Sequence, residues 1–179
     1  MDGDERLRLF LALRLPESVV GTLTEWQTRE LGGAGPVRIV APDHLHITLA
    51  FLGSRSAEEL PAIVDVLERA AVAAAPAPLA VVGYRETRSV GMLTLRDGTG
   101  AATSLAGRLY EDLASLGVYR PEQRPWLPHV TVVRFRERPR LRPAVPEAEW
   151  VSSDAAAFLS RLHPSGARYE VLNSFPLGG

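Results

Sequence analysis

Residues 45–49 read Leu-His-Ile-Thr-Leu, and residues 129–133 read His-Val-Thr-Val-Val. Each stretch is rich in apolar and β-branched residues, which is typical of a β-strand. Because successive side chains of a strand point to opposite faces, the histidine and the threonine of each copy share one face. The four residues of this His-x-Thr repeat are His46, Thr48, His129 and Thr131. The repeat predicts two strands that each present an imidazole beside a hydroxyl.

The repeat is unexpected for this composition. With four His and nine Thr, a shuffled chain would contain roughly 0.2 His-x-Thr triplets. The alternative is that both histidines are ordinary half-buried strand residues. A pair of imidazoles can accept and donate protons near neutral pH, and hydroxyls can hydrogen-bond an anionic oxygen. The residues therefore predict a metal-independent site for attack on a phosphodiester, with His46 and His129 as the acid–base pair.

Length and composition indicate one domain. The 179 residues, of which 46% are hydrophobic, are expected to form a single domain over residues 1–179 with two lobes, each contributing one His-x-Thr strand. No apolar run approaches the roughly 18 residues of a membrane span. The acidic opening, residues 1–6, lacks the features of a secretory signal, and the chain has no cysteine. We expect a monomer in the cytoplasm, without membrane association and without a cofactor.

Charge is unevenly distributed along the chain. The net charge is −1, and all 20 basic residues are arginine. Residues 120–142 contain seven arginines but only two acidic residues, Glu122 and Glu137. Guanidinium groups suit bidentate contact with phosphate. Two interpretations of this segment stay open: weak, salt-sensitive attraction of RNA through groups such as Arg138 and Arg140, or a solvated loop in an arginine-preferring chain.

Periodicity and turn residues predict an α+β fold with antiparallel sheet. The period of two in residues 7–15 predicts a half-buried strand. The sequence Ser-Ala-Glu-Glu at 56–59 predicts a capping box, and Gly53 is expected to end the strand before it. The expected strands are 7–15, 37–40, 45–52, 79–84, 90–96, 126–135, 155–162 and 168–171, and the expected helices are 16–31, 57–75 and 102–116.

A metal site is the competing interpretation of the first motif. His44 and His46 share a strand face, and Asp43 is nearby. This interpretation would leave the second His-x-Thr triplet unexplained, so we predict no metal ligands.

Two motifs resemble those of a known family. Residues 43–53 (DHLHITLAFLG) and 128–134 (PHVTVVR) resemble the paired motifs of the 2H phosphoesterases, and within them the bacterial RNA 2',3'-cyclic phosphodiesterases, also called 2'-5' RNA ligases. The opening leucine-rich strand and residues 159–172 are similar to the family's first strand and closing hairpin. The resemblance implies a bilobal, pseudo-twofold α+β fold. Two antiparallel sheets would form a central concave cleft, with helices on the outside.

The resemblance also implies residue roles. His46 and His129 correspond to the catalytic pair, with His129 activating water and His46 protonating the 3'-oxygen. Thr48 and Thr131 correspond to the phosphate-binding residues. Arg134 and Phe51 correspond to substrate contacts, and Phe51 would stack on a base. Strict alternation places both on the wrong face of their strands, so each requires a bulge or a strand end.

The implied reaction is hydrolysis of RNA ends or nucleotides that carry a 2',3'-cyclic phosphate, leaving a 2'-phosphate. Two alternatives remain at this point. The same residues could join RNA ends through a 2'-5' bond, or the chain could be a non-catalytic module that binds RNA or nucleotides.

Overall fold

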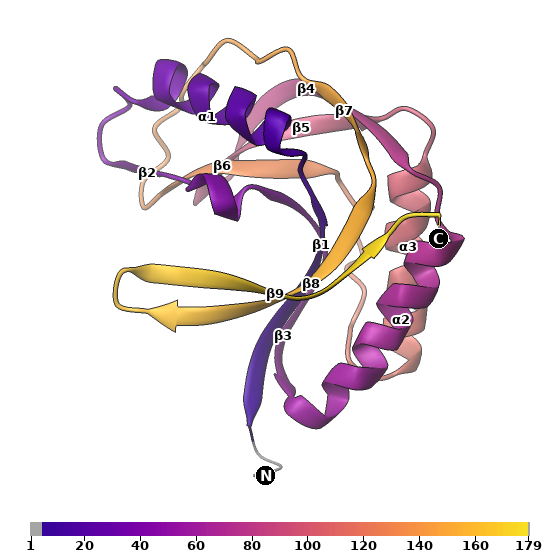
Figure 1. The fold of residues 1–179 in the computed structure, drawn as a ribbon. Coiled ribbons are helices and arrows are strands. Elements are labelled where there is room, and N and C mark those ends of the chain that lie inside the picture. The colour runs from indigo at the N-terminus through magenta and orange to yellow at the C-terminus, as the bar shows by residue number, and fades with distance from the viewer. Residues whose placement is uncertain (1–4, 179) are drawn as a thin grey trace.

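Two antiparallel sheets form the framework of residues 5–178, the part of the chain that the computed structural model describes (Figure 1). The first has the order β3-β1-β8-β9 and the second the order β2-β6-β5-β4-β7. The strands of the first sheet are β3 (His46–Ser56), β1 (Arg6–Arg14), β8 (Asp154–His163) and β9 (Gly166–Pro176). Those of the second are β2 (Val37–Ile39), β6 (His129–Phe135), β5 (Val90–Asp97), β4 (Ala77–Glu86) and β7 (Glu149–Ser152). The predicted α+β fold with two antiparallel sheets is confirmed.

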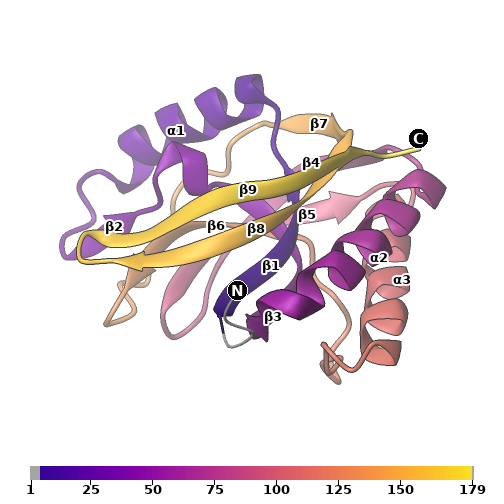
Figure 2. The same cartoon turned by 60° about the horizontal axis from the view of Figure 1, so that its bottom comes forward.

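The helices lie on the outside of the sheets. Helices α2 (Leu60–Ala73) and α3 (Ala101–Ser115) pack side by side, and α1 (Glu17–Leu31) lies away from them (Figures 1 and 2). Short 3₁₀ turns, η1 (Pro42–His44) and η2 (Ala57–Glu59), precede β3 and α2 respectively. None of the helices within residues 5–178 combines the length and the hydrophobicity that a membrane span requires.

The capping box before α2 is confirmed. The backbone N–H of Ser56 donates to Glu59 Oε2 at 2.8 Å, and the Ser56 hydroxyl accepts the N–H of Glu58 at 3.3 Å. The first turn after it is 3₁₀, so the α-helix itself begins at Leu60.

The chain crosses between the sheets, so neither sheet is built from one half of the sequence alone. Strand β2 precedes the first motif strand but pairs with β6 of the second sheet. Strands β8 and β9 end the chain but belong to the first sheet, where β8 pairs with both β1 and β9. Each sheet nevertheless contains one His-x-Thr strand, because β3 and β6 fall in different sheets.

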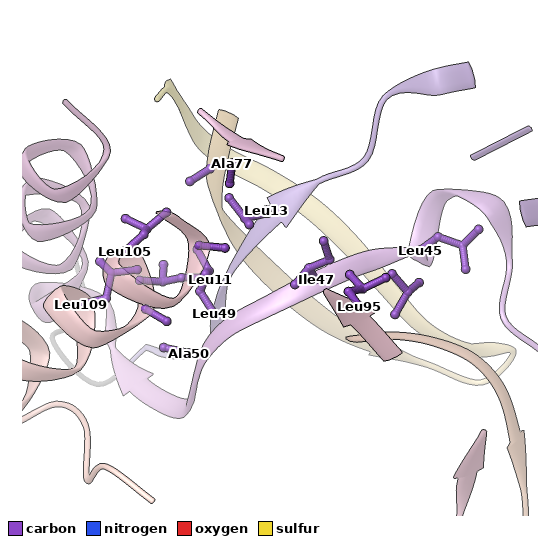
Figure 3. Close-up of a cluster of buried hydrophobic side chains, with 14 of the residues drawn as sticks. Leu11, Leu13, Leu45, Ile47, Leu49, Ala50, Ala77, Leu95, Leu105 and Leu109 are labelled. Carbon is purple, nitrogen blue, oxygen red and sulfur yellow. The ribbon is translucent and has the colours of Figure 1, made fainter. Parts of the chain in front are cut away.

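Strand β1 is buried on both faces, not on one as its alternation predicted. Leu9, Leu11 and Leu13 enter the main core. Figure 3 shows Leu11 and Leu13 within this cluster. On the opposite face, Phe10 and Ala12 join a second cluster, which we call the aromatic cluster. Its members are Phe10, Ala12, Ala156 and Phe158, with Tyr169 packed against them. The second face is covered because the rings of Phe158, from β8, and Tyr169, from β9, pack against the ring of Phe10.

Several strands differ from the sequence prediction; strand β9, expected over residues 168–171, runs from Gly166 to Pro176. Strand β3 continues through Gly53, whose φ of +67° is accommodated opposite Leu9, and ends at Ser56. Strand β6 begins at His129, so Trp126 lies before it. Strand β7 was not predicted; it has four residues and pairs only with β4 at the sheet edge. Such a short edge strand carries too little periodicity to be recognised locally.

Candidate active site

A cleft of about 530 Å³ receives side chains from both motif strands. Five of the six predicted site residues line it: His46, Thr48, Phe51, Thr131 and Arg134. The sixth, His129, is not part of the lining. It lies two residues before Thr131 and therefore on the same face of β6. The structure thus brings the two predicted motifs to one place, although they lie in different sheets and 83 residues apart in sequence.

The two motif strands are built alike. Over residues 46–52 and residues 129–135, half-buried, buried and exposed positions follow in the same order. Ile47 and Val130 are fully buried, and each anchors its strand in the core. Because neighbouring side chains alternate, this burial turns the flanking histidine and threonine away from the core, toward the cleft.

A bulge in β3 brings Phe51 to the cleft face. Thr48 lies opposite Ala12 and Ala50 lies opposite Leu11, which leaves Leu49 without a partner on β1. The extra residue shifts the alternation by one position. Phe51, three residues after Thr48, consequently lies on the same side as the motif.

A second bulge does the same for Arg134. Thr131 lies opposite Met92 and Val133 opposite Gly91, so Val132 is the extra residue of β6. The buried side chain of Gln27, from α1, donates to the carbonyl oxygen of Val132 at 2.8 Å and to that of Val40 at 3.1 Å. Gln27 therefore fastens the bulge. This role of Gln27 was not predicted from the sequence, where the available signal was a glutamine on an otherwise apolar helix face.

The ring of His46 is held by one hydrogen bond at each nitrogen. Nδ1 lies 2.7 Å from the carbonyl oxygen of His44, and Nε2 lies 2.9 Å from Thr48 Oγ1. A carbonyl only accepts, so Nδ1 carries the proton and, in the neutral ring, Nε2 accepts from the Thr48 hydroxyl. His129 repeats the first of these contacts, since its Nδ1 lies 2.8 Å from the carbonyl oxygen of Leu127, also two residues earlier.

Burial makes His46 a poor base in the absence of an anion. The loss of hydration lowers its pKa from 6.5 to about 4. The hydrogen bond to the His44 carbonyl opposes this change, while positive charge on Arg134 and on His129 adds to it. The ring of Phe10 packs against His46 at a centroid distance of 4.9 Å. His46 is therefore uncharged at neutral pH in the free protein.

Tyr169 is a cleft residue that the sequence did not single out. Its ring stacks on His44 at a centroid distance of 4.2 Å and meets the ring of His46 edge-on at 5.7 Å. His44 also lines the cleft. Tyr169 lies in β9, more than a hundred residues beyond the first motif, so only the tertiary structure reveals its place.

Trp126 links the segment before β6 to strand β3. Its indole Nε1–H donates to the backbone carbonyl oxygen of Thr48 at 3.1 Å, and its ring packs against the main core. Trp126 therefore joins the segment before β6 to the first motif strand.

The competing metal interpretation receives no support from the described residues. Within residues 5–178, no three His, Cys, Asp or Glu side chains are grouped so that they could hold a metal ion.

The arginine-rich segment is fastened to the second sheet. Arg138 Nε lies 3.3 Å from Glu86 Oε1, and Glu86 also accepts the Leu141 N–H at 3.0 Å and the Tyr84 hydroxyl at 2.9 Å. Burial alone would raise the pKa of Glu86, but these hydrogen bonds hold it below its ordinary value. Neither interpretation of this segment anticipated that Arg138 is engaged in the fold.

Comparison with known proteins identifies the family. A family model described as the 2'-5' RNA ligase superfamily matches residues 15–163. The chain is 35% identical to an RNA 2',3'-cyclic phosphodiesterase of Thermus thermophilus, over 97% of this chain and 91% of the relative. It is 32% identical to an RNA 2',3'-cyclic phosphodiesterase of Escherichia coli, over 73% of each.

Solved structures agree with the sequence comparisons. A crystal structure of a protein from Thermus thermophilus superposes with a TM-score of 0.85 at 33% identity, covering 97% of this chain and 99% of that one. Escherichia coli LigT complexed with 3'-AMP gives a TM-score of 0.87 at 26% identity, covering 98% and 100%. The chain therefore belongs to the 2'-5' RNA ligase superfamily, a group of 2H phosphoesterases.

Proposed function

We propose that this protein is an RNA 2',3'-cyclic phosphodiesterase that needs no metal ion and uses His46 and His129 as its acid–base pair. The convergence of the two motif strands on one cleft carries this proposal. The names of the relatives support it, as does the nucleotide 3'-AMP bound to Escherichia coli LigT. Because these relatives are named as enzymes, an enzyme is favoured over a non-catalytic binding module.

The reaction requires one proton to be removed and one to be supplied. Water attacks phosphorus, its proton passes to one imidazole, and the bond from phosphorus to the 3'-oxygen breaks as the other imidazole protonates that oxygen. The product carries a 2'-phosphate. We propose the roles that the family resemblance implies: His129 takes the proton from water, and His46 protonates the leaving oxygen.

We propose that substrate binding favours the protonated form of His46, which its role as proton donor requires. In the free protein, the Thr48 hydroxyl donates to Nε2 of His46. A bound phosphoryl oxygen can accept this hydroxyl instead, which frees Nε2 and places a negative charge beside the ring. An adjacent anion favours the charged form of an imidazole, so we propose that the phosphate raises the pKa of His46.

The other cleft residues have complementary roles. Thr131 and Arg134 would hold phosphoryl oxygens, and Phe51, whose side chain is 49% exposed, offers a ring on which a base can stack. All these groups come from one chain. We therefore propose that a monomer is sufficient, and we propose the cytoplasm as its location.

A 2'-5' ligase activity is the second candidate, and the name of the matching family favours it. In that direction, the 5'-hydroxyl of another RNA end would take the place of water at the same site.

Turnover without metal is the direct test. Protein dialysed against EDTA is expected to convert adenosine 2',3'-cyclic phosphate, and a short RNA ending in a cyclic phosphate, to the 2'-phosphate, because the proposed acid and base are both imidazoles. Phosphorus NMR distinguishes this product from the 3'-phosphate. No product from either substrate would contradict the function, and turnover that returns only after a divalent ion is added would contradict metal independence.

Alanine substitutions of Arg134 and Arg138 should have sharply different effects on kcat/KM, although the two residues lie only four positions apart. Arg134→Ala is expected to lower kcat/KM by about 10- to 100-fold, the range for losing one hydrogen bond to a charged group. Arg138→Ala is the matched control: its partner is Glu86, so it should reduce stability and leave kcat/KM unchanged. Steady-state kinetics and urea denaturation on both variants check this, and equal kinetic losses would contradict the assigned roles.

A further inference from the structure

The cleft contains more positive charge than one cyclic phosphate requires. Three arginines, Arg8, Arg38 and Arg134, belong to its lining, which includes neither aspartate nor glutamate. A cyclic phosphate diester carries a single negative charge, which is less than the charge of three arginines. The chain as a whole is not basic, since its net charge is −1. Positive charge is therefore concentrated at this one place.

Within residues 5–178, no carboxylate forms an ion pair with any of the three cleft arginines. In the described part of the chain, ion pairs with carboxylates are formed by other arginines: Arg14, Arg29, Arg55, Arg108, Arg124, Arg138 and Arg161. No such pair involves Arg8, Arg38 or Arg134 within residues 5–178. Their charges remain available to a ligand.

Arg38 lies directly beside Arg134. The two are opposite each other in the register of β2 and β6, and both are exposed. Like charges at directly opposed positions of neighbouring strands are destabilising. A bound anion at this position would relieve the repulsion, and a second anionic group would do so more fully than one shared phosphate.

Arg8 provides a cation on the first lobe. It lies in β1, and its guanidinium carbon is 5.0 Å from the centroid of the Phe51 ring. A contact with an aromatic face orders the guanidinium but leaves its charge in place. Arg8 thus lies beside the ring proposed to stack on a base, across the cleft from the second sheet that contains Arg38 and Arg134.

We propose that Arg8 and Arg38 bind backbone phosphates of the RNA chain that leads to the cyclic end. This inference rests on the proposed function, in which Arg134 and the two threonines hold the reacting phosphate. Each further nucleotide adds one phosphodiester, and the remaining guanidinium groups match those charges. From the sequence alone, residues 120–142 were the candidates for this role.

The test compares substrates that differ only in the number of phosphates. Adenosine 2',3'-cyclic phosphate is compared with the adenosine dinucleotide and trinucleotide ending in the same group. For Arg8→Ala and Arg38→Ala, we expect KM for the trinucleotide to rise about 10-fold, since one charged contact is lost. KM for the mononucleotide should change by less than about twofold, because this substrate has no backbone phosphate for either arginine to contact. The slope of log KM against log salt for the trinucleotide should fall in magnitude by about 0.7 per variant.

Arg142→Ala is the matched control, because Arg142 is exposed and outside the cleft lining. Its KM values should remain those of the wild type. Equal losses on the mononucleotide and the trinucleotide would overturn the inference, because the arginine would then contact the reacting phosphate. No loss on any substrate, or the same loss with Arg142→Ala, would also overturn it.

A second readout does not depend on catalysis: the affinity for the reaction product, the trinucleotide 2'-phosphate, is measured by calorimetry. Loss of affinity in Arg8→Ala and Arg38→Ala supports the inference even without turnover, and unchanged affinity contradicts it. Failure of the wild type to hydrolyse all three substrates contradicts the proposed function instead.

Discussion

Replacement of His46 or His129 by alanine is expected to lower kcat for adenosine 2',3'-cyclic phosphate by about 10²- to 10⁴-fold, the range for general acid–base groups. Each variant leaves one proton transfer without its imidazole, while Thr48, Thr131 and Arg134 remain. Because the two groups act in one step, the double variant should be little slower than either single variant. Steady-state kinetics on each purified variant measure the effect.

His163→Ala is the matched control for these variants. His163 is the exposed last residue of β8, just before the turn to β9, and its Nδ1 is paired with the hydroxyl of Ser165 at 2.9 Å. Its replacement should leave kcat unchanged. Circular dichroism separates loss of catalysis from loss of folding. Turnover close to that of the wild type in either His46→Ala or His129→Ala would show that the paired-histidine mechanism is wrong.

Acidification from about pH 6.5 to pH 4 is expected to remove up to about 3 kcal/mol of stability through His46 alone. Its pKa is about 4 in the folded protein and 6.5 when exposed, so the unfolded chain binds the proton first in this window. Stability therefore increases with pH between these values and is lost as the pH falls. The cause is burial of the ring against Phe10, which disfavours the imidazolium.

The comparison of wild type with His46→Asn isolates this contribution. Asparagine does not titrate, whereas the carboxylates that titrate in the same range are common to both proteins. Urea denaturation at pH 7 and pH 4 should show a smaller loss of unfolding free energy in the variant, by up to about 3 kcal/mol. Equal losses in both proteins would contradict the lowered pKa of His46.

The sequence predicted the regular elements better than their ends. Helix α2 follows its predicted capping box because the signal lies within a few residues of the helix. Strand β3 was expected to end at Gly53, but pairing with β1 carries it to Ser56. The short edge strand β7 depends on β4 for its hydrogen bonds, so its own residues contained no sufficient signal.

The candidate site was predicted only where local alternation was sufficient. The His-x-Thr pairs could be placed on one face of each strand from their spacing, and the cleft contains His46, Thr48 and Thr131. Phe51 and Arg134 were placed on the wrong face by the same rule, because bulges depend on which residues of the neighbouring strand are paired. The roles of all these residues in catalysis stay predictions.

The sequence by itself determined that two strands would each present a histidine and a threonine, because alternation is a property of the local backbone. Only the tertiary structure decided which other groups join them. Arg8, Arg38 and Tyr169 enter the cleft because segments distant in sequence are brought together by the order of strands in the two sheets. Arg138 lies outside the cleft lining and pairs with a buried carboxylate, that of Glu86. Such long-range contacts depend on sheet order and register, which no short stretch of sequence specifies.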